Sequence, residues 1–161
     1  YFYVMPMKIE GSSNIEAIFS IFHDGVITSH VVKDGKLVLD IEIQYLAERI
    51  SPGFTKFHVL LENVENIRFT TWPSNFKSDP ELISDLNTIF APELDILEGN
   101  TKENQIQVIC NQSSSDYDYC GGELYFSAVA AIVSDENGKE YSIDELDVLC
   151  KGYWDEWASN K

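Results

Sequence analysis

Positively charged residues are scarce in this sequence. Its 161 residues include 11 Lys and Arg against 27 Asp and Glu, which gives a formal net charge of −16 at pH 7. Binding to the phosphates of DNA or RNA needs clustered Lys and Arg that displace counterions, so the composition argues against a nucleic-acid partner. The same negative field would attract a basic protein and speed their encounter. Acidity can also serve only to keep a protein soluble, and that alternative stays open.

Cysteines and long apolar runs are scarce as well. Cys110, Cys120 and Cys150 are an odd number without a short-spaced pair, so neither a zinc ribbon nor a complete disulfide framework is indicated. We expect free thiols in a reducing, cytoplasmic compartment, with a Cys110–Cys120 disulfide left open. The apolar start, residues 1–7, is too short to span a bilayer and is interrupted by Pro6, so no membrane association is expected.

The motifs of several common catalytic sites are also missing. The chain has no Gly-rich phosphate loop, no G-x-S-x-G elbow and no H-E-x-x-H pair. We therefore expect no cofactor, and the sequence gives little support to nucleophilic catalysis. Its length and its apolar fraction of 44% fit one globular domain over residues 1–161.

The most regular stretch predicts a β-hairpin. Asp34-Gly35 lies between the apolar run 26–32 and a run with strand alternation, and an Asp-Gly pair in this setting is typical of a type I′ turn. The apolar face of the second strand consists of Leu37, Leu39, Ile41, Ile43 and Tyr45.

Three apolar stripes with helical spacing predict amphipathic helices. The first and last begin with a Ser-x-x-Glu capping box, and the second begins with an Asp-Pro pair. The helices and their marker residues are 14–22 with Ser13 and Glu16, 80–90 with Asp79 and Pro80, and the helix after Ser142, which carries Glu145, Trp154 and Trp157.

Further strands are predicted on both sides of the middle helix. Short connections favour sequential antiparallel pairing, with the fourth strand beside the third. We expect an α+β fold in which a mainly antiparallel meander sheet is packed by a short N-terminal helix, a middle helix and a C-terminal helix. The further strands are 54–62, 67–72, 93–97, 105–111 and 123–134, with turns at Gly99-Asn100-Thr101 and Asn137-Gly138.

A His-Asp pair stands at the predicted corner between the first helix and the hairpin. Adjacent His and Asp residues occur in metal-dependent phosphohydrolases, and His23, Asp24 and His30 are the residues that could hold one metal ion here. The alternative is structural: His23 or Asp24 hydrogen-bonds backbone groups at the corner, and Gly25 supplies permissive backbone angles.

A second candidate site is the loop 111–122, with the sequence NQSSSDYDYCGG. Tyr residues among Ser, Asp and Gly are typical of adaptable recognition surfaces, because Tyr gives rigid contact area. The candidate partner-binding residues are Asp116, Tyr117, Asp118 and Tyr119. The alternative is a surface connection without a binding role.

The succession of short helix, Phe22-His23-Asp24, Asp-Gly hairpin and meander resembles a group of small bacterial proteins that includes immunity proteins of polymorphic toxin systems. The resemblance covers roughly residues 15–72. It implies neutralisation of a toxin by direct binding, and it implies no catalytic residue.

Our leading hypothesis is a non-catalytic protein-binding module, specifically an immunity-type inhibitor of a basic toxin or another basic protein. The competing hypothesis is a small metal-dependent hydrolase centred on His23, Asp24 and His30. A third is a subunit whose exposed aromatics, such as Trp154 and Trp157, form an interface, because the sequence leaves the oligomeric state open.

Overall fold

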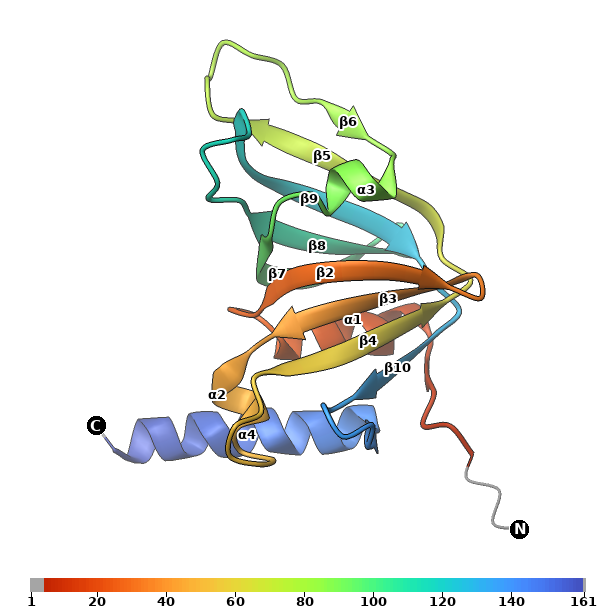
Figure 1. Cartoon of the computed structure of the whole chain (residues 1–161), viewed down its shortest axis with the longest axis vertical. Coiled ribbons are helices and arrows are strands. Elements are labelled where there is room, and N and C mark those ends of the chain that lie inside the picture. The colour runs from red at the N-terminus through yellow and green to blue at the C-terminus, as the bar shows by residue number, and fades with distance from the viewer. Residues whose placement is uncertain (1–4, 161) are drawn as a thin grey trace.

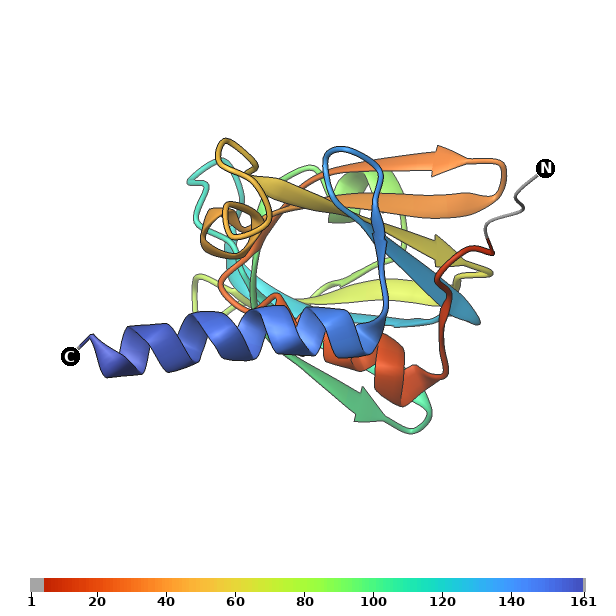
Figure 2. The ribbon, with the colours of Figure 1, turned by 90° about the horizontal axis from the view of Figure 1, so that it is seen from below.

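The computed structural model describes residues 5–160, in which a strongly curved antiparallel sheet is the main feature (Figures 1 and 2). Most of the apolar start, residues 1–4, lies outside this range. In the described range no helix has both the length and the apolar character needed to cross a bilayer. The helices are α1 (Ser12–Ile21), α2 (Gln44–Ala47), α3 (Leu86–Ile89) and α4 (Ile143–Ser159).

The described strands form one eleven-stranded sheet with the order β1-β10-β4-β3-β2-β7-β8-β9-β5-β6, and β11 pairs with β10. Each strand pair is antiparallel, and two three-stranded meanders, β2-β3-β4 and β7-β8-β9, make up its centre. The α+β fold class predicted from the sequence is confirmed. The strands are β1 (Ile9–Glu10), β2 (Val26–Lys33), β3 (Lys36–Glu42), β4 (Lys56–Glu62), β5 (Glu65–Pro73), β6 (Leu82–Ile83), β7 (Leu94–Lys102), β8 (Gln105–Asn111), β9 (Tyr119–Ser127), β10 (Ala130–Ser134) and β11 (Glu140–Tyr141).

Helix α1 packs where the two meanders meet. Strands β2 and β7 pair only through Val26 and Ile27 of β2, so the sheet itself holds its two halves together weakly at this point. Phe19 of α1 lies edge-on to Phe126 of β9, with ring centroids 5.8 Å apart. Phe22, just after α1, stacks on Phe57 of β4 at 5.0 Å. These buried aromatic contacts join both halves of the sheet to one helix.

The predicted hairpin is confirmed. Strands β2 and β3 pair along their lengths, and Asp34 and Gly35 have φ values of 53° and 75°, the two positive angles that a type I′ turn requires. The second strand ends earlier than predicted, at Glu42. Tyr45 belongs to α2, where its ring contacts Tyr153 at 4.4 Å, so tertiary contacts override the strand alternation.

Two of the three predicted helix starts differ from the structure. Helix α1 begins at Ser12 after Gly11, and no side chain caps it; Glu16 instead accepts a hydrogen bond from Ser20. The predicted helix over 80–90 is a short strand, β6, followed by the single turn of α3, which is capped by Asp85 rather than Asp79. The capping box of Ser142 and Glu145 at the start of α4 is confirmed.

The strand order also corrects the sequence prediction. Strand β5 pairs with β9 and β6 instead of β4, so the chain crosses from one half of the sheet to the other at residues 63–64. The predicted strand 123–134 is divided at Ala128 and Val129, because β9 belongs to one half and β10 to the other. The turn predicted at Gly99 lies instead at Glu103 and Asn104, whose φ values are 54° and 63°.

Gly99 is a strand residue for a packing reason. A Cβ atom at this position would lie 3.0 Å from the carbonyl oxygen of Glu16 and 3.1 Å from the Cβ of Phe19, both in α1. Glycine therefore allows α1 to approach β7 closely. The asparagine-glycine turn at residues 137–138 is confirmed, with Gly138 at φ 84°.

Candidate functional site

The loop between β8 and β9 is built around one buried side chain, that of Gln112. Its amide nitrogen donates to the carbonyl oxygens of Tyr119, at 2.8 Å, and Ser114, at 3.1 Å. Its amide oxygen accepts from the backbone N–H of Ser114, and its own backbone N–H donates to Cys120. Only 5% of Gln112 is exposed. The loop is therefore a folded structure held by an internal amide.

This loop lies beside the connection between β5 and β6, the loop at the top of Figure 1. The backbone N–H of Ser74 donates to the carbonyl oxygen of Asp118 at 3.0 Å. Beside this hydrogen bond, residues of both segments line a hollow of about 340 Å³. Its lining consists of Thr71, Pro73, Ser78, Asp79, Glu81, Asp116, Tyr117, Asp118 and Tyr119.

A second hollow, of about 360 Å³, lies on the other side of Asp116 and Tyr117. The connection between α3 and β7 forms its far wall, through Ala91, Pro92 and Glu93. Asp116 and Tyr117 therefore stand on a ridge between two hollows. No Lys or Arg is among the residues that line either hollow.

The lining of the first hollow is both acidic and aromatic. Four carboxylates belong to it, and the rings of Tyr117 and Tyr119 lie 5.8 Å apart. Burial raises the pKa of the Tyr119 phenol, and the nearby Tyr117 and Glu81 raise it further. The structure thus brings the four sequence-predicted residues, Asp116, Tyr117, Asp118 and Tyr119, to the two hollows and adds Asp79 and Glu81.

Sequence reasoning missed one further residue near this surface, Phe76. Its side chain is 92% exposed in the loop between β5 and β6. Asn75 holds the turn, because its side chain accepts from the N–H of Lys77 and its carbonyl oxygen accepts from the N–H of Ser78. An aromatic residue between turn-forming polar residues was the signal available in the sequence.

The structure does not bring His23, Asp24 and His30 together as one group. His23 lies 3.8 Å from Asp24, between His23 Nε2 and Asp24 Oδ2, while His30 contacts Asn87 at 3.0 Å and the ring of Phe90. Over residues 5–160 no group of three or more His, Cys, Asp or Glu side chains is placed to hold a metal ion.

His23 has structural contacts at the corner after α1. Its Nδ1–H donates to the carbonyl oxygen of Ser20 at 2.9 Å, and its ring stacks on Trp154 at 5.6 Å. The positive φ of this corner, 71°, belongs to Asp24 rather than Gly25. Gly25 is needed for space, because a Cβ atom there would lie 2.8 Å from the carbonyl oxygen of Phe22.

The aromatic residues near the end of α4 form a cluster around Trp154. Its ring lies 5.0 Å from Tyr153, 5.6 Å from Trp157 and 6.0 Å from Tyr45. Trp154 is thus largely covered by its neighbours, whereas Trp157 is 47% exposed. The three cysteines are free, so the disulfide between Cys110 and Cys120 that the sequence left open is not formed.

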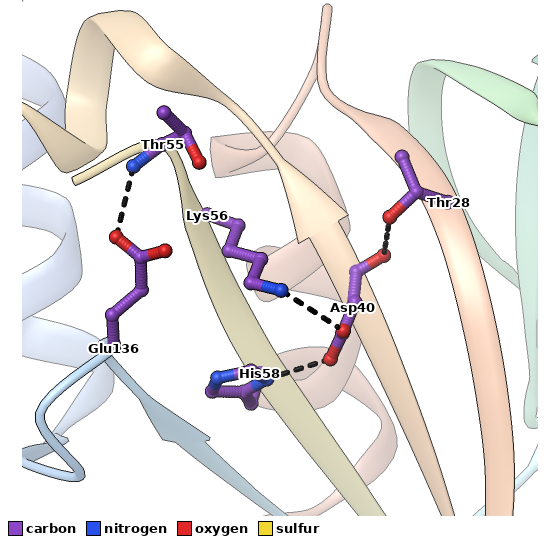
Figure 3. Close-up of polar contacts among 6 residues, drawn as sticks. All are labelled: Thr28, Asp40, Thr55, Lys56, His58 and Glu136. Atoms are coloured by element: carbon purple, nitrogen blue, oxygen red, sulfur yellow. Dashed lines mark hydrogen bonds and ion pairs between the residues drawn. The ribbon is translucent and has the colours of Figure 1, made fainter. Parts of the chain in front are cut away.

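A separate polar group lies on the outer face of β3 and β4, centred on Asp40 (Figure 3). His58 Nδ1 donates to Asp40 Oδ1 at 2.6 Å, and Lys56 Nζ lies 3.5 Å from Asp40 Oδ2. Burial raises the pKa of Asp40, but the hydrogen bond and charge of His58, with smaller contributions from Ser29 and Lys56, outweigh it. The pKa of Asp40 therefore lies below its usual value.

Comparison with protein-family models, with curated proteins and with solved structures gives no match for this chain.

The variant Gln112→Ala tests whether this side chain holds the loop. We expect unfolding to require about 1–3 kcal/mol less free energy, because buried backbone groups lose their partners. Amide hydrogens of residues 113–118 should exchange faster. Urea unfolding and hydrogen exchange measure both effects, with Gln44→Ala, at an exposed glutamine, as the control. Wild-type stability and exchange in Gln112→Ala would contradict this role.

The variant Asp40→Asn tests the polar group on the outer face. Because the folded-state pKa of Asp40 is lowered, its carboxylate stabilises the fold above the unfolded-state pKa, and this stabilisation is lost as the pH falls through the folded-state value. We expect a loss of about 1 kcal/mol at neutral pH that shrinks as the pH falls below the unfolded-state pKa of Asp40. Urea unfolding across this range, with Asp155→Asn as the control, measures the difference. A difference in unfolding free energy between the wild type and Asp40→Asn that does not change with pH would contradict the lowered pKa of Asp40.

Proposed function

We propose that this chain is a non-catalytic protein-binding module that binds a basic protein through the surface around Asp116 and Tyr117. One observation carries the proposal. The Gln112-held loop and the connection between β5 and β6 place four carboxylates and two tyrosines around one hollow, and no Lys or Arg lines it. We call these residues the acidic hollow: Thr71, Pro73, Ser78, Asp79, Glu81, Asp116, Tyr117, Asp118 and Tyr119.

The chemistry of the acidic hollow suits a Lys or Arg side chain of the partner. Carboxylates form charge-assisted hydrogen bonds with guanidinium and ammonium groups, and tyrosine faces attract the same cations. The net charge of −16 extends the attraction beyond the contact surface and increases the rate of encounter with a basic protein.

An exposed aromatic residue adds an apolar contact beside the charges. Phe76 is 92% exposed, so its ring contributes little to folding, yet it lies on the loop that supplies Ser78, Asp79 and Glu81 to the acidic hollow. Protein interfaces commonly combine a few aromatic anchors with surrounding polar contacts. We propose that Phe76, two residues before Ser78 on this loop, is such an anchor; the Nζ of the adjacent Lys77 lies 6.0 Å from its ring centroid.

The finer proposal is an immunity-type inhibitor that acts in the cytoplasm. It is supported by the resemblance of residues 15–72 to immunity proteins of toxin systems and by three thiols that remain free, as in a reducing compartment. In this role the acidic hollow would cover basic residues that the toxin uses on its own target, and inhibition would need no catalytic group.

The experiment begins with capture of the partner from the source lysate, stepwise elution with salt and identification by mass spectrometry. The purified partner is then titrated calorimetrically with the wild type, the double variant Asp116→Asn/Asp118→Asn and Tyr117→Ala. We expect each variant to bind at least about tenfold more weakly, since truncation of an anchor residue at the centre of an interface costs about 2 kcal/mol or more. Added salt should weaken wild-type binding.

The matched control is Asp147→Asn/Asp155→Asn, which removes the same charge from exposed positions on α4. This control should keep nearly the wild-type affinity. A basic partner whose affinity is unchanged by salt and by both loop variants would contradict the proposal, as would a control that loses as much affinity as the loop variants.

A further inference from the structure

The outer face of strands β2, β3, β4 and β10 carries an apolar row that the core does not use. The strand register places one apolar residue of each strand side by side in the middle of this face. We call Val31, Val38, Leu60 and Ile132 the apolar row. None of the four belongs to the buried core or to the residues packed against it; Val31 is 55% exposed, and the other three are half-buried.

The helices that cover these strands lie on their other side. In Figure 2 the strands β2, β3 and β4 form the upper wall, while α1 and α4 lie below them. The inward residues of β3 and β4, such as Leu39 and Val59, are fully buried. The apolar row therefore faces away from α1 and α4.

Charged and polar residues flank the apolar row in an alternating pattern. On one side, Lys36 of β3 lies 3.7 Å from Glu62 of β4, between Nζ and Oε1. On the other side, Asp40 of β3 accepts the hydrogen bond of His58 of β4 at 2.6 Å (Figure 3). In these two rows β3 and β4 each carry one acidic and one hydrogen-donating group, and the order reverses between the two strands. Two further lysines contact the same carboxylates: Lys8 Nζ lies 3.1 Å from Glu62 and Lys56 Nζ lies 3.5 Å from Asp40.

Such an alternating pattern is complementary to itself. A rotation by 180° about an axis along the strands places Lys36 of one copy over Glu62 of the other, and Asp40 over His58. A rotation about the axis across the strands places Lys36 over Asp40, and Glu62 over His58. Either two-fold axis also places the apolar row on its own equivalent, as an isologous interface requires.

We infer that this outer face binds a second copy of the chain, with the two apolar rows packed against each other as in face-to-face sheets. The local charges favour this occupant. Lys33 and Lys36 lie on this face, so it does not suit a basic protein. Its positive and negative charges balance, which avoids the repulsion that the net charge of −16 causes elsewhere between two copies. The acidic hollow lies on different strands, so the two surfaces are separate.

The size of the face predicts a weak dimer. Three rows on four strands span about 14 Å in each direction between the outermost Cα atoms, from the usual rise per residue and strand spacing. This footprint is smaller than that of standard specific interfaces, which bury about 800 Å² on each partner, so association should depend strongly on concentration.

The test is sedimentation velocity of the whole chain from about 10 µM to about 500 µM at physiological salt, a range suited to weak association. We expect the dimer fraction of the wild type to rise with concentration. Leu60→Lys and Val31→Lys should each weaken association at least about tenfold, because they place two buried charges at the two-fold contact. Val148→Lys, at a 71% exposed valine on α4, should leave it unchanged.

A second pair of variants tests the charge pattern. Lys36→Glu places like charges opposite each other under both two-fold axes and should weaken the dimer, whereas Lys151→Glu makes the same change in net charge on α4 and should not. Thermal unfolding confirms that each variant is folded.

A wild-type chain that stays monomeric over the whole range would overturn the inference. So would a dimer that survives Leu60→Lys, Val31→Lys and Lys36→Glu alike, or one that is lost in Val148→Lys and so depends on α4.

Discussion

The rest of the structure depends on the packing of two phenylalanines at α1. Phe19 contacts Phe126 in one half of the sheet, and Phe22 contacts Phe57 in the other. At the junction of the two halves, β2 and β7 share only a two-residue pairing. Burial of these rings and of their neighbours therefore holds the curvature that the strand ladder does not enforce. The two segments around the acidic hollow belong to one of these halves, where β5 pairs directly with β9.

Some local signals in the sequence predicted local structure correctly, whereas the capping box at Ser13 and the helix start at Asp79-Pro80 were wrong. Asp34-Gly35 requires positive φ angles that only a few turn types accept, and Ser142 with Glu145 satisfies the first N–H groups of α4, so both elements follow from nearby residues. The remaining failures involve distant residues. The placement of β5 beside β9, the strand conformation at Gly99 and the division between β9 and β10 depend on packing against other parts of the chain.

The candidate site shows the same division between local and distant causes. The composition of the loop indicated Asp116, Tyr117, Asp118 and Tyr119 as candidate contact residues, because Tyr among Ser, Asp and Gly gives rigid contact area. The structure adds that Tyr119 is half-buried against the core. The hydrogen bonds by which Gln112 holds the loop, and the position of Asp79 and Glu81 in the lining of the acidic hollow, depend on the fold around the loop. The sequence alone could therefore not predict them. In our account the molecule has two separate surfaces: an acidic one for a basic protein and a charge-balanced one for its own copy.

The most direct test of the central claim is to map the surface that the basic partner covers. The chain is labelled with ¹⁵N, the purified partner is added, and amide chemical shifts are followed. We predict that the largest changes occur in the β5–β6 connection, residues 74–81, and in the loop 112–119. Changes centred on the outer face of β3 and β4, or on α4, with these two segments unaffected, would contradict the account.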